Sequence, residues 1–172
     1  MNTKAIPSSL TVVHRCGFVL VHREATPEKL DRVKWLNDQE INEYIGDTKE
    51  NTSIEKQQEW FDRYKSDKSK EFYTICSDKK PIGIIGLSHI DSKRKEAKLF
   101  VVIGEKEYQS RGIGKKAIEF IIDYGFNILG LNIILSEVYA GNAKAIKCYQ
   151  SVGFLSDGLK NDGLDTKKSK MI

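Results

Sequence analysis

The stretch Gln109-Ser110-Arg111-Gly112-Ile113-Gly114-Lys115 decides the fold of this chain, because it joins an apolar run to a long helical pattern. Glycines at positions 112 and 114 allow other groups to approach the backbone closely. Free N–H groups at the start of the following helix point outward together, and the positive end of the helix dipole lies behind them. Such a corner binds phosphate groups, and Arg111 and Lys115 add positive charge at its rim. The stretch therefore predicts a diphosphate ligand; the alternative is a glycine-rich loop that only turns the chain.

Two other phosphate-binding motifs fit this stretch less well. A P-loop requires a glycine at position 109 and a serine or threonine after Lys115, and neither is present. The dinucleotide fingerprint is a closer rival, because Gly112-x-Gly114-x-x-Ala117 satisfies it and Glu137 lies 25 residues after Gly112. However, eight residues separate the preceding apolar run from Gly112, and only 35 residues follow Glu137. The spacing therefore disfavours a nicotinamide-binding fold.

The residues around this stretch predict a three-strand antiparallel meander followed by a strand–helix–strand crossover. The run from 99 to 103 is apolar on both faces, which is typical of a central strand. The predicted strands are 71–76, 82–90, 97–103 and 133–138, with a further strand starting at Phe154. The predicted helices are 112–129 and 142–152, the second closed by Gly153.

The first third of the chain predicts one strand and two helices. Residues 17–23 form a β-branched run that predicts the first strand. Thr26-Pro27-Glu28 is typical of a helix start, and this helix is expected to end near Asn37. Thr52-x-x-Glu55 is a capping-box pattern that predicts the start of the second helix. The polar residues between are expected to form a loop or short helical turns. The fold class is therefore α+β or mixed α/β.

Composition points to one domain over residues 1–172, because 172 residues with 40 % hydrophobic content suffice for a single core. The 28 basic and 24 acidic residues give a net charge of +4, which does not argue for nucleic acid. The basic run at 167–170 is expected to be a solvated tail. Three cysteines (Cys16, Cys76 and Cys148) without metal-ligand spacing predict reduced thiols, no metal site and a cytoplasmic location. The apolar residues 10–21 are too short and too interrupted to indicate a membrane segment.

Two motifs in the correct order resemble the acetyl-CoA-binding core of the GNAT superfamily of N-acetyltransferases. They are Gln109-x-x-Gly112-x-Gly114 and Asn142-x-x-Ala145-x-x-x-Tyr149-x-x-x-Gly153-Phe154. The resemblance runs from about Phe18 to Phe154. Three further stretches resemble two subgroups, the spermidine and ribosomal-protein N-acetyltransferases and the amino-sugar acetyltransferases. These stretches are Trp35-x-Asn37-Asp38, Glu107-Tyr108-Gln109 and Asp123-Tyr-Gly-Phe126.

The resemblance implies a central twisted mixed sheet, mostly antiparallel, that splays between its fourth and fifth predicted strands and is flanked by about four helices. It implies acetyl-CoA as cosubstrate. The loop residues Gln109, Ser110, Arg111, Gly112, Ile113, Gly114 and Lys115 would hold the pyrophosphate. The backbone of Val102, Ile103 and Gly104 would pair with the pantetheine arm like an added strand. Asn142 would contact the pantetheine or the acceptor-side loop.

The resemblance also assigns Tyr149 as the group that protonates the departing CoA thiolate. A phenol with a pKa near 10 stays protonated at neutral pH and can supply that proton; the alternative is a core aromatic. Glu137, at a strand end, could accept a proton from the ammonium substrate, and a solvated carboxylate is equally expected. His89 is another candidate base. Cys148 would be a buried thiol rather than an acetyl carrier.

The expected reaction is acetyl transfer from acetyl-CoA to the primary amine of a polyamine or amino sugar, by direct attack in a ternary complex. The alternatives are acetylation of a protein N-terminus and a non-catalytic acetyl-CoA-binding module. The acids Glu40, Glu43, Asp47 and Glu50 could receive a polycation, or could belong to a solvated loop. Beyond the core at 18–154, residues 155–172 are short and polar. We therefore expect a loose acceptor-site wall there, or one completed in a homodimer.

Overall fold

The central strands of the protein are built by the apolar runs that follow residue 70. The structure is a computed structural model that describes residues 11–14, 18–22, 32–45, 51–78, 80–161 and 165–171. Strands β3 (Glu71–Ser77), β4 (Lys80–Asp91) and β5 (Glu96–Ile103) form the predicted antiparallel meander. A helix and strand β6 (Ile133–Tyr139) follow, and β6 pairs with β5 in parallel. The meander and the crossover are therefore confirmed.

Strands β5 and β6 diverge part of the way along their length. They pair only from Glu96↔Ile133 to Leu99↔Ser136, whereas β5 continues beside β4 as far as the pair Gly83↔Ile103. Beyond Leu99, none of the described strands pairs with this edge of β5. This fork is the predicted splay, and the fold class is confirmed.

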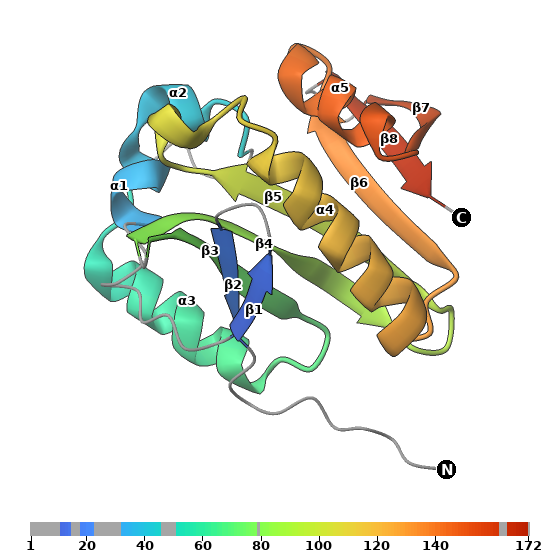
Figure 1. Cartoon of the computed structure of the whole chain (residues 1–172), viewed down its shortest axis with the longest axis horizontal. Helices are drawn as coiled ribbons and strands as arrows, with labels where there is room; N and C mark the ends of the chain where they lie inside the picture. Colours follow the sequence, from blue (N-terminus) through green and yellow to red (C-terminus); the bar gives the residue numbers. More distant parts are fainter. Residues whose placement is uncertain are drawn as a thin grey trace.

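The sheet has eight strands, in the order β1-β2-β3-β4-β5-β6-β8-β7 (Figure 1). Strand β2 (Phe18–His22) was predicted, and β1 (Thr11–His14), which extends the edge, was not. The C-terminal residues form β7 (Leu155–Asn161) and β8 (Asp165–Met171), and β8 pairs with β6 over Ile134↔Met171 to Tyr139↔Thr166. The expectation of a solvated tail at 167–170 is wrong, because these residues lie in β8 and pair with β6. Main-chain groups make this pairing, so polar composition does not prevent it.

Helices cover both faces of the sheet. Phe72 on β3 stacks on Tyr64 of α3 (Ile54–Ser66) at 4.5 Å between ring centroids. The next residue, Tyr73, meets Phe120 of α4 (Ile113–Asp123) edge-on at 5.6 Å. Because neighbouring strand residues point to opposite faces, α3 and α4 lie on opposite sides of the sheet (Figure 1).

Helix α1 (Arg32–Asn37) ends where the first predicted helix was expected to end. A short helix, α2 (Gln39–Asn42), follows it, which is one of the two alternatives expected for the polar residues after Asn37, and Asp38 caps α2 by accepting from the amides of Glu40 and Ile41. The predicted start at Thr26-Pro27 lies outside the described residues. The predicted capping box is displaced by one residue: Ser53, not Thr52, caps α3, by accepting from the Lys56 amide at 3.3 Å.

The helix predicted over 112–129 changes geometry near its end. Helix α4 stops at Asp123 and continues as a π-helical turn, η3 (Tyr124–Ile128). A side chain at Gly125 would come within 2.8 Å of Ile134 on β6, so the glycine allows the turn to pack directly on the sheet. The last helix, α5 (Ala143–Ser151), confirms the prediction over 142–152. The core lies between α4, α5 and the strands β3 to β6.

Candidate active site

The loop between β5 and α4 presents backbone amides that donate to no described backbone carbonyl. Ser110 and Gly112 both have left-handed backbone conformations, with φ of 58° and 79°. The first hydrogen bond of α4 runs from Lys116 N to Gly112 O at 3.2 Å. Within the described part of the chain, no backbone carbonyl accepts from the amides of residues 110–115. Alternating left- and right-handed residues before a helix form an anion-binding concavity.

Two features keep this loop open and in place. A Cβ atom at Gly112 would meet nothing within 4 Å, so the space in front of its backbone is free. The Gln109 side chain donates from Nε2 to the carbonyl oxygen of Ile103 at 3.0 Å. This bond ties the loop to the end of β5, and Gln109 therefore also has a structural role.

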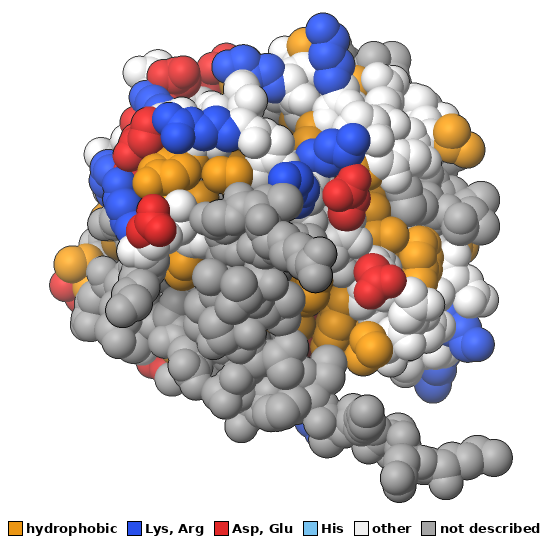
Figure 2. All heavy atoms as spheres, viewed as in Figure 1, with side chains coloured by type: hydrophobic (Ala, Val, Ile, Leu, Met, Phe, Trp, Pro, Cys, Tyr) orange, Lys and Arg blue, Asp and Glu red, His pale blue; other side chains and the backbone are white. Residues whose placement is uncertain are grey.

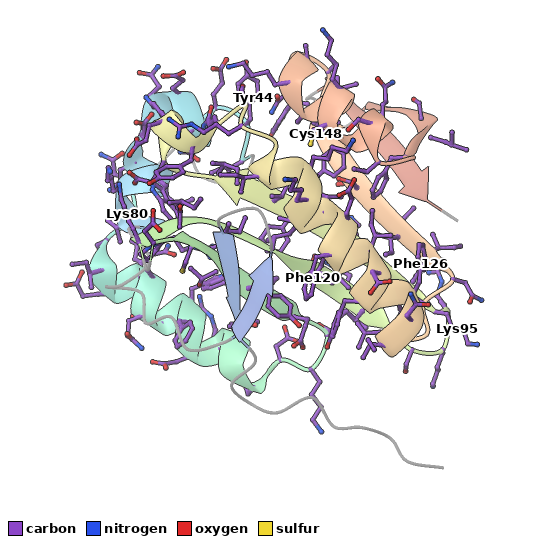
Figure 3. All side chains as sticks on the ribbon, viewed as in Figure 1. Tyr44, Lys80, Lys95, Phe120, Phe126 and Cys148 are labelled. Atoms are coloured by element: carbon purple, nitrogen blue, oxygen red, sulfur yellow. The ribbon has the colours of Figure 1, made fainter. Side chains whose placement is uncertain are left out.

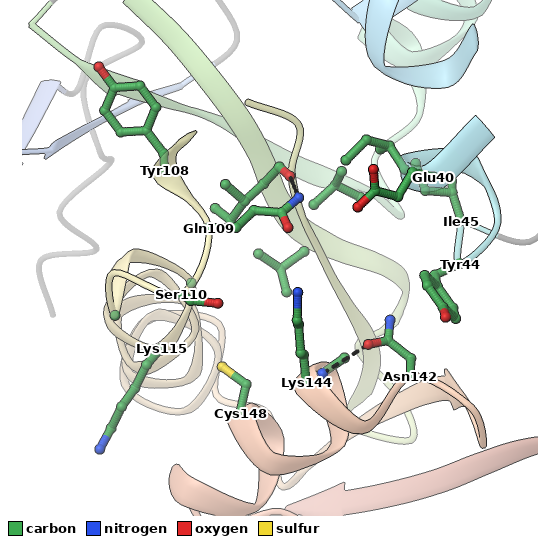
Figure 4. Close-up of a pocket in the computed structure, with 17 residues that line it drawn as sticks. Glu40, Tyr44, Ile45, Tyr108, Gln109, Ser110, Lys115, Asn142, Lys144 and Cys148 are labelled. Carbon is green, nitrogen blue, oxygen red and sulfur yellow. Dashed lines mark hydrogen bonds between the residues drawn. The ribbon is translucent and has the colours of Figure 1, made fainter. Parts of the chain in front are cut away.

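A cavity of about 310 Å³ connects this loop with the end of β5 and with α2 and the turn after it (Figure 4). Figure 3 shows Tyr44 and Cys148, which border this cavity from different parts of the chain, at the same end of the molecule. The lining residues come from α2 and the turn after it, the end of β5, the loop, and α5. They are Glu40, Ile41, Tyr44, Ile45, Val101, Val102, Ile103, Tyr108, Gln109, Ser110, Gly112, Gly114, Lys115, Asn142, Lys144, Ala145 and Cys148.

The two ends of the cavity differ in charge. Lys115 and Lys144 border it on the helix side, and Figure 4 shows Lys144 projecting between Gln109 and Asn142. Glu40 borders the other end, where its carboxylate accepts from Lys106 Nζ at 2.7 Å. Elsewhere on the viewed face, basic and acidic side chains are interspersed rather than gathered by sign (Figure 2). The cationic end suits phosphate groups, and the other end combines one paired carboxylate with aromatic and aliphatic walls.

The cavity gathers most of the predicted cofactor residues. Val102, Ile103, Gln109, Ser110, Gly112, Gly114, Lys115 and Asn142 line it. Asn142 caps α5, because its Oδ1 accepts from the Ala145 amide at 3.0 Å.

Three predicted cofactor residues lie outside the lining. The Gly104 amide donates to Ile82 O at 2.9 Å, and the Trp35 ring covers the Gly104 Cα. The Gly104 N–H is therefore already used in a hydrogen bond to β4. The Arg111 guanidinium lies 5.3 Å from the centre of the Tyr108 ring, and Ile113 packs on the core.

Tyr149 lies behind the cavity wall rather than in it. Its side chain is 5 % exposed and meets Phe154 edge-on at 5.1 Å. It follows Ala145 by four residues, so both lie on the same face of α5. Burial raises the pKa of Tyr149 to about 12, although the nearby Ser136 hydroxyl lowers it. The phenol therefore stays protonated at neutral pH, as a proton donor must.

The other candidate acid–base residues lie apart from the cavity lining. Glu137 pairs with Lys98 at 3.1 Å. It lies one residue from the buried Ser136 on β6, and therefore on the opposite face of the sheet. His89 lies near the end of β4, beside the pair Ser88↔Lys98 at the start of β5, whereas the loop follows the opposite end of β5.

Cys148 borders the cavity, and burial raises the pKa of its thiol.

Glu105 is a site residue that the sequence did not single out. It is 3 % exposed, and its carboxylate accepts from Lys34 Nζ, Trp35 Nε1 and Lys80 Nζ at 2.8–2.9 Å. These bonds lower the pKa of Glu105 to about 2. Glu105 thus joins α1 to the end of β5.

The sequence analysis did not predict that the cavity is lined by Tyr44, Tyr108 and Lys144, although Lys144 lies inside the Asn142-x-x-Ala145 motif.

The forked sheet, the amide-lined loop and the cavity that they share are typical of the GNAT fold. The family model of the acetyltransferase (GNAT) domain matches residues 20–155, and the chain belongs to this family. The predicted superfamily is therefore confirmed.

Individual relatives agree with this assignment. The spermidine N(1)-acetyltransferase of Escherichia coli K12 is 30 % identical over 57 % of this chain and 52 % of its own length. The acetyltransferase PseH of Campylobacter jejuni strain 81-176 is 27 % identical over 70 % of this chain and 73 % of its own length. The chain thus spans about half the length of the first of these relatives.

A solved structure shares the fold. The spermidine N-acetyltransferase of Vibrio cholerae, in complex with CoA and spermine, superposes with a TM-score of 0.80 at 21 % identity. The match covers 90 % of this chain and 95 % of that protein.

None of the helices in the described part of our chain has the length and apolar character that a bilayer-spanning helix requires.

Proposed function

We propose that this protein transfers an acetyl group from acetyl-CoA to the primary amine of a small molecule. One observation carries the proposal: Ser110, Gly112, Gly114 and Lys115, whose amides donate to no described backbone carbonyl, border the same cavity as the edge of β5 that no described strand covers. Together they provide an anion site next to main-chain groups available for an extended ligand. CoA has both features, a diphosphate and an amide-containing arm.

The residues of the chain would share the work as follows. The amides of 110–115 and Lys144 would hold the diphosphate, while Val102 and Ile103 would pair with the pantetheine arm. Acetyl-CoA supplies the activated thioester, which the neutral amine attacks directly in a ternary complex. Tyr149 would give its proton to the sulfur as the carbon–sulfur bond breaks. The base that receives the proton of the amine would be Glu137, His89 or water; their positions favour water, because neither side chain borders the cavity.

The acceptor would enter at the end formed by α2, beside Glu40, Tyr44 and Ile45. A polyamine is supported by the name of the Escherichia coli relative and by the spermine in the Vibrio cholerae complex. An amino sugar is the second small-molecule candidate. Acetylation of a protein N-terminus and acetyl-CoA binding without turnover are the alternatives from other classes. We also propose that the chain acts as one domain in the cytoplasm, as a monomer or homodimer.

Release of free thiol from acetyl-CoA, measured with a panel of amines, tests this proposal. The panel contains spermidine, an amino-sugar nucleotide and a peptide with a free N-terminus. Turnover with spermidine or the amino sugar supports the proposal, and turnover with the peptide alone supports the protein acceptor. A thermal shift with CoA but no thiol release with any amine would leave only the binding module. If the protein shows neither CoA binding nor thiol release, the cofactor assignment is refuted.

A further inference from the structure

We propose that Glu40 selects amine acceptors that carry a second positive charge away from the reacting nitrogen. This inference rests on the proposed acetyl transfer, and it narrows the acceptor of the same cavity to diamines and polyamines. Its basis is the position of Glu40 in the cavity, the contact by which Lys106 holds its carboxylate, and the difference in charge between the two ends of the cavity.

Glu40 is the one acidic residue among the described residues that line the cavity. Its side chain is 70 % exposed, so a ligand that enters from solvent can reach the carboxylate. Figure 4 shows Glu40 and Tyr44 on the opposite side of the cavity from Lys115. Because the diphosphate is proposed to bind on the lysine side, an acceptor that enters from the α2 end meets the carboxylate first.

Lys106 holds the Glu40 carboxylate in place without neutralising this end of the cavity. It lies in the short helical turn η2 (Lys106–Tyr108), and its Nζ is 2.7 Å from Glu40 Oε2 and 2.9 Å from Asp38 Oδ2. Hydrogen bonds to these two carboxylates raise the pKa of Lys106, so its ammonium stays charged. Two carboxylates and one ammonium leave negative charge in excess, and Glu40 Oε1 has lone pairs for a further donor.

The chemistry of the acceptor explains why this charge would act as a selector. The reacting amine must be neutral when it attacks the thioester, so a carboxylate cannot hold it through charge at that moment. A second alkylamine has a pKa of about 10, like that of lysine, and therefore stays an ammonium at neutral pH. Glu40 can accept a charge-assisted hydrogen bond from this ammonium, and the Tyr44 ring at the same end offers a cation–π contact. A nucleotide-linked amino sugar instead brings a diphosphate, which the Glu40 carboxylate repels.

Thiol release from acetyl-CoA by the full chain, with matched pairs of acceptors, tests this selection. The diamines are putrescine, cadaverine and longer homologues, each paired with the amino alcohol in which a hydroxyl replaces the second amine. We expect kcat/KM of the wild type to be about tenfold higher for the preferred diamine than for its amino alcohol, the effect of one charge-assisted hydrogen bond. Glu40→Gln should reduce this preference to about twofold, mainly through a higher KM for the diamine.

Two controls distinguish selection by charge from a change in packing. Glu43→Gln removes an acid that follows α2 but does not border the cavity, and it should keep the preference of the wild type. Added salt should narrow the preference of the wild type and leave that of Glu40→Gln unchanged, because salt screens charges at exposed residues.

The outcomes separate this inference from the function on which it rests. Equal kcat/KM for diamine and amino alcohol in the wild type, or a preference that survives in Glu40→Gln, would overturn the role of Glu40 while acetyl transfer stands. Faster turnover of an amino-sugar nucleotide than of any diamine would do the same. An equal loss of preference in Glu43→Gln would assign the effect to the charge of the whole segment, and would also overturn the role of Glu40. No thiol release with any amine would refute the proposed function and this inference with it.

Discussion

Replacing Glu105 with glutamine should destabilise the protein at neutral pH and much less in acid. The carboxylate is almost fully buried and binds two ammonium groups and the Trp35 indole. Glutamine keeps an oxygen for the indole but loses the negative charge between Lys34 and Lys80. The substitution therefore isolates the electrostatic part of this contact, with little change in volume.

The lowered pKa of Glu105 sets the upper limit of the effect. A fall from 4.5 to about 2 corresponds to about 3 kcal/mol at neutral pH. Lys34 and Lys80 are 64 % and 44 % exposed, so water screens both pairs. We therefore expect a loss of about 1–2 kcal/mol, or about 3–6 °C in the thermal midpoint. Because the folded-state pKa lies below the unfolded-state value, this stabilisation is complete above about pH 5 and is lost as pH falls from 4.5 toward 2.

Urea unfolding followed by tryptophan fluorescence, at pH values from 7 down to 3.5, measures this difference. The gap between wild type and Glu105→Gln should narrow over the lower half of the range. Glu107→Gln is the control, since Glu107 also pairs with Lys80 but is exposed, and its midpoint should match the wild type. A gap that stays constant from pH 7 to 3.5 would assign the effect to packing, and no gap at all would refute the electrostatic reasoning.

Three further substitutions probe the site. Tyr149→Phe should lower kcat by about 10²-fold while calorimetry shows CoA affinity nearly unchanged; a wild-type kcat would remove the phenol from its role. Gly112→Glu should abolish CoA binding, because it places a carboxylate at a left-handed position facing the free amides, and normal affinity in titration calorimetry would disprove the diphosphate site. Gly104→Ala should lower stability by about 1–3 kcal/mol, because the new methyl carbon would lie 2.0 Å from Trp35 Cδ2. Thermal unfolding checks this, and an unchanged midpoint would mean that the indole moves aside freely.

The parts of the fold that depend on local patterns could be read from the sequence. The meander, α4, β6 and α5 follow from apolar periodicity and from glycines at their ends, and the structure has them within a few residues. The predicted capping box was wrong by one residue. Thr52 and Ser53 can both cap a helix, and only the backbone geometry selects Ser53. The π-helical turn after Asp123 arises where Gly125 packs on Ile134, a contact between separate elements that periodicity does not encode.

Strand β8 was not predicted, for a related physical reason. Strand β8 contributes to the sheet through main-chain pairing along β6, and its polar side chains carry no hydrophobic signal. The same holds for the order of the last strands, since β8 lies between β6 and β7 although it follows both in sequence. Composition predicts what can be buried, but it does not predict which backbone edge is available.

The loop that we propose for the diphosphate could be singled out from the sequence, whereas most of the wall that we propose for the acceptor could not, because the two are encoded differently. The anion-binding loop is made by consecutive residues, so glycine spacing before a helix suffices to identify it. The wall proposed for the acceptor is held by contacts between α1–α2 and the segment after β5. These contacts join Trp35 to Gly104, Lys34 and Trp35 to Glu105, and Lys106 to Glu40. The hydrogen bonds from Trp35 and Lys34 to Glu105 connect residues that are 70 and 71 positions apart in the sequence. Motif spacing does not predict such pairs, because in the sequence each lysine or glutamate looks like an ordinary surface residue. Only the fold places the segment after β5 between the two ends of the cavity.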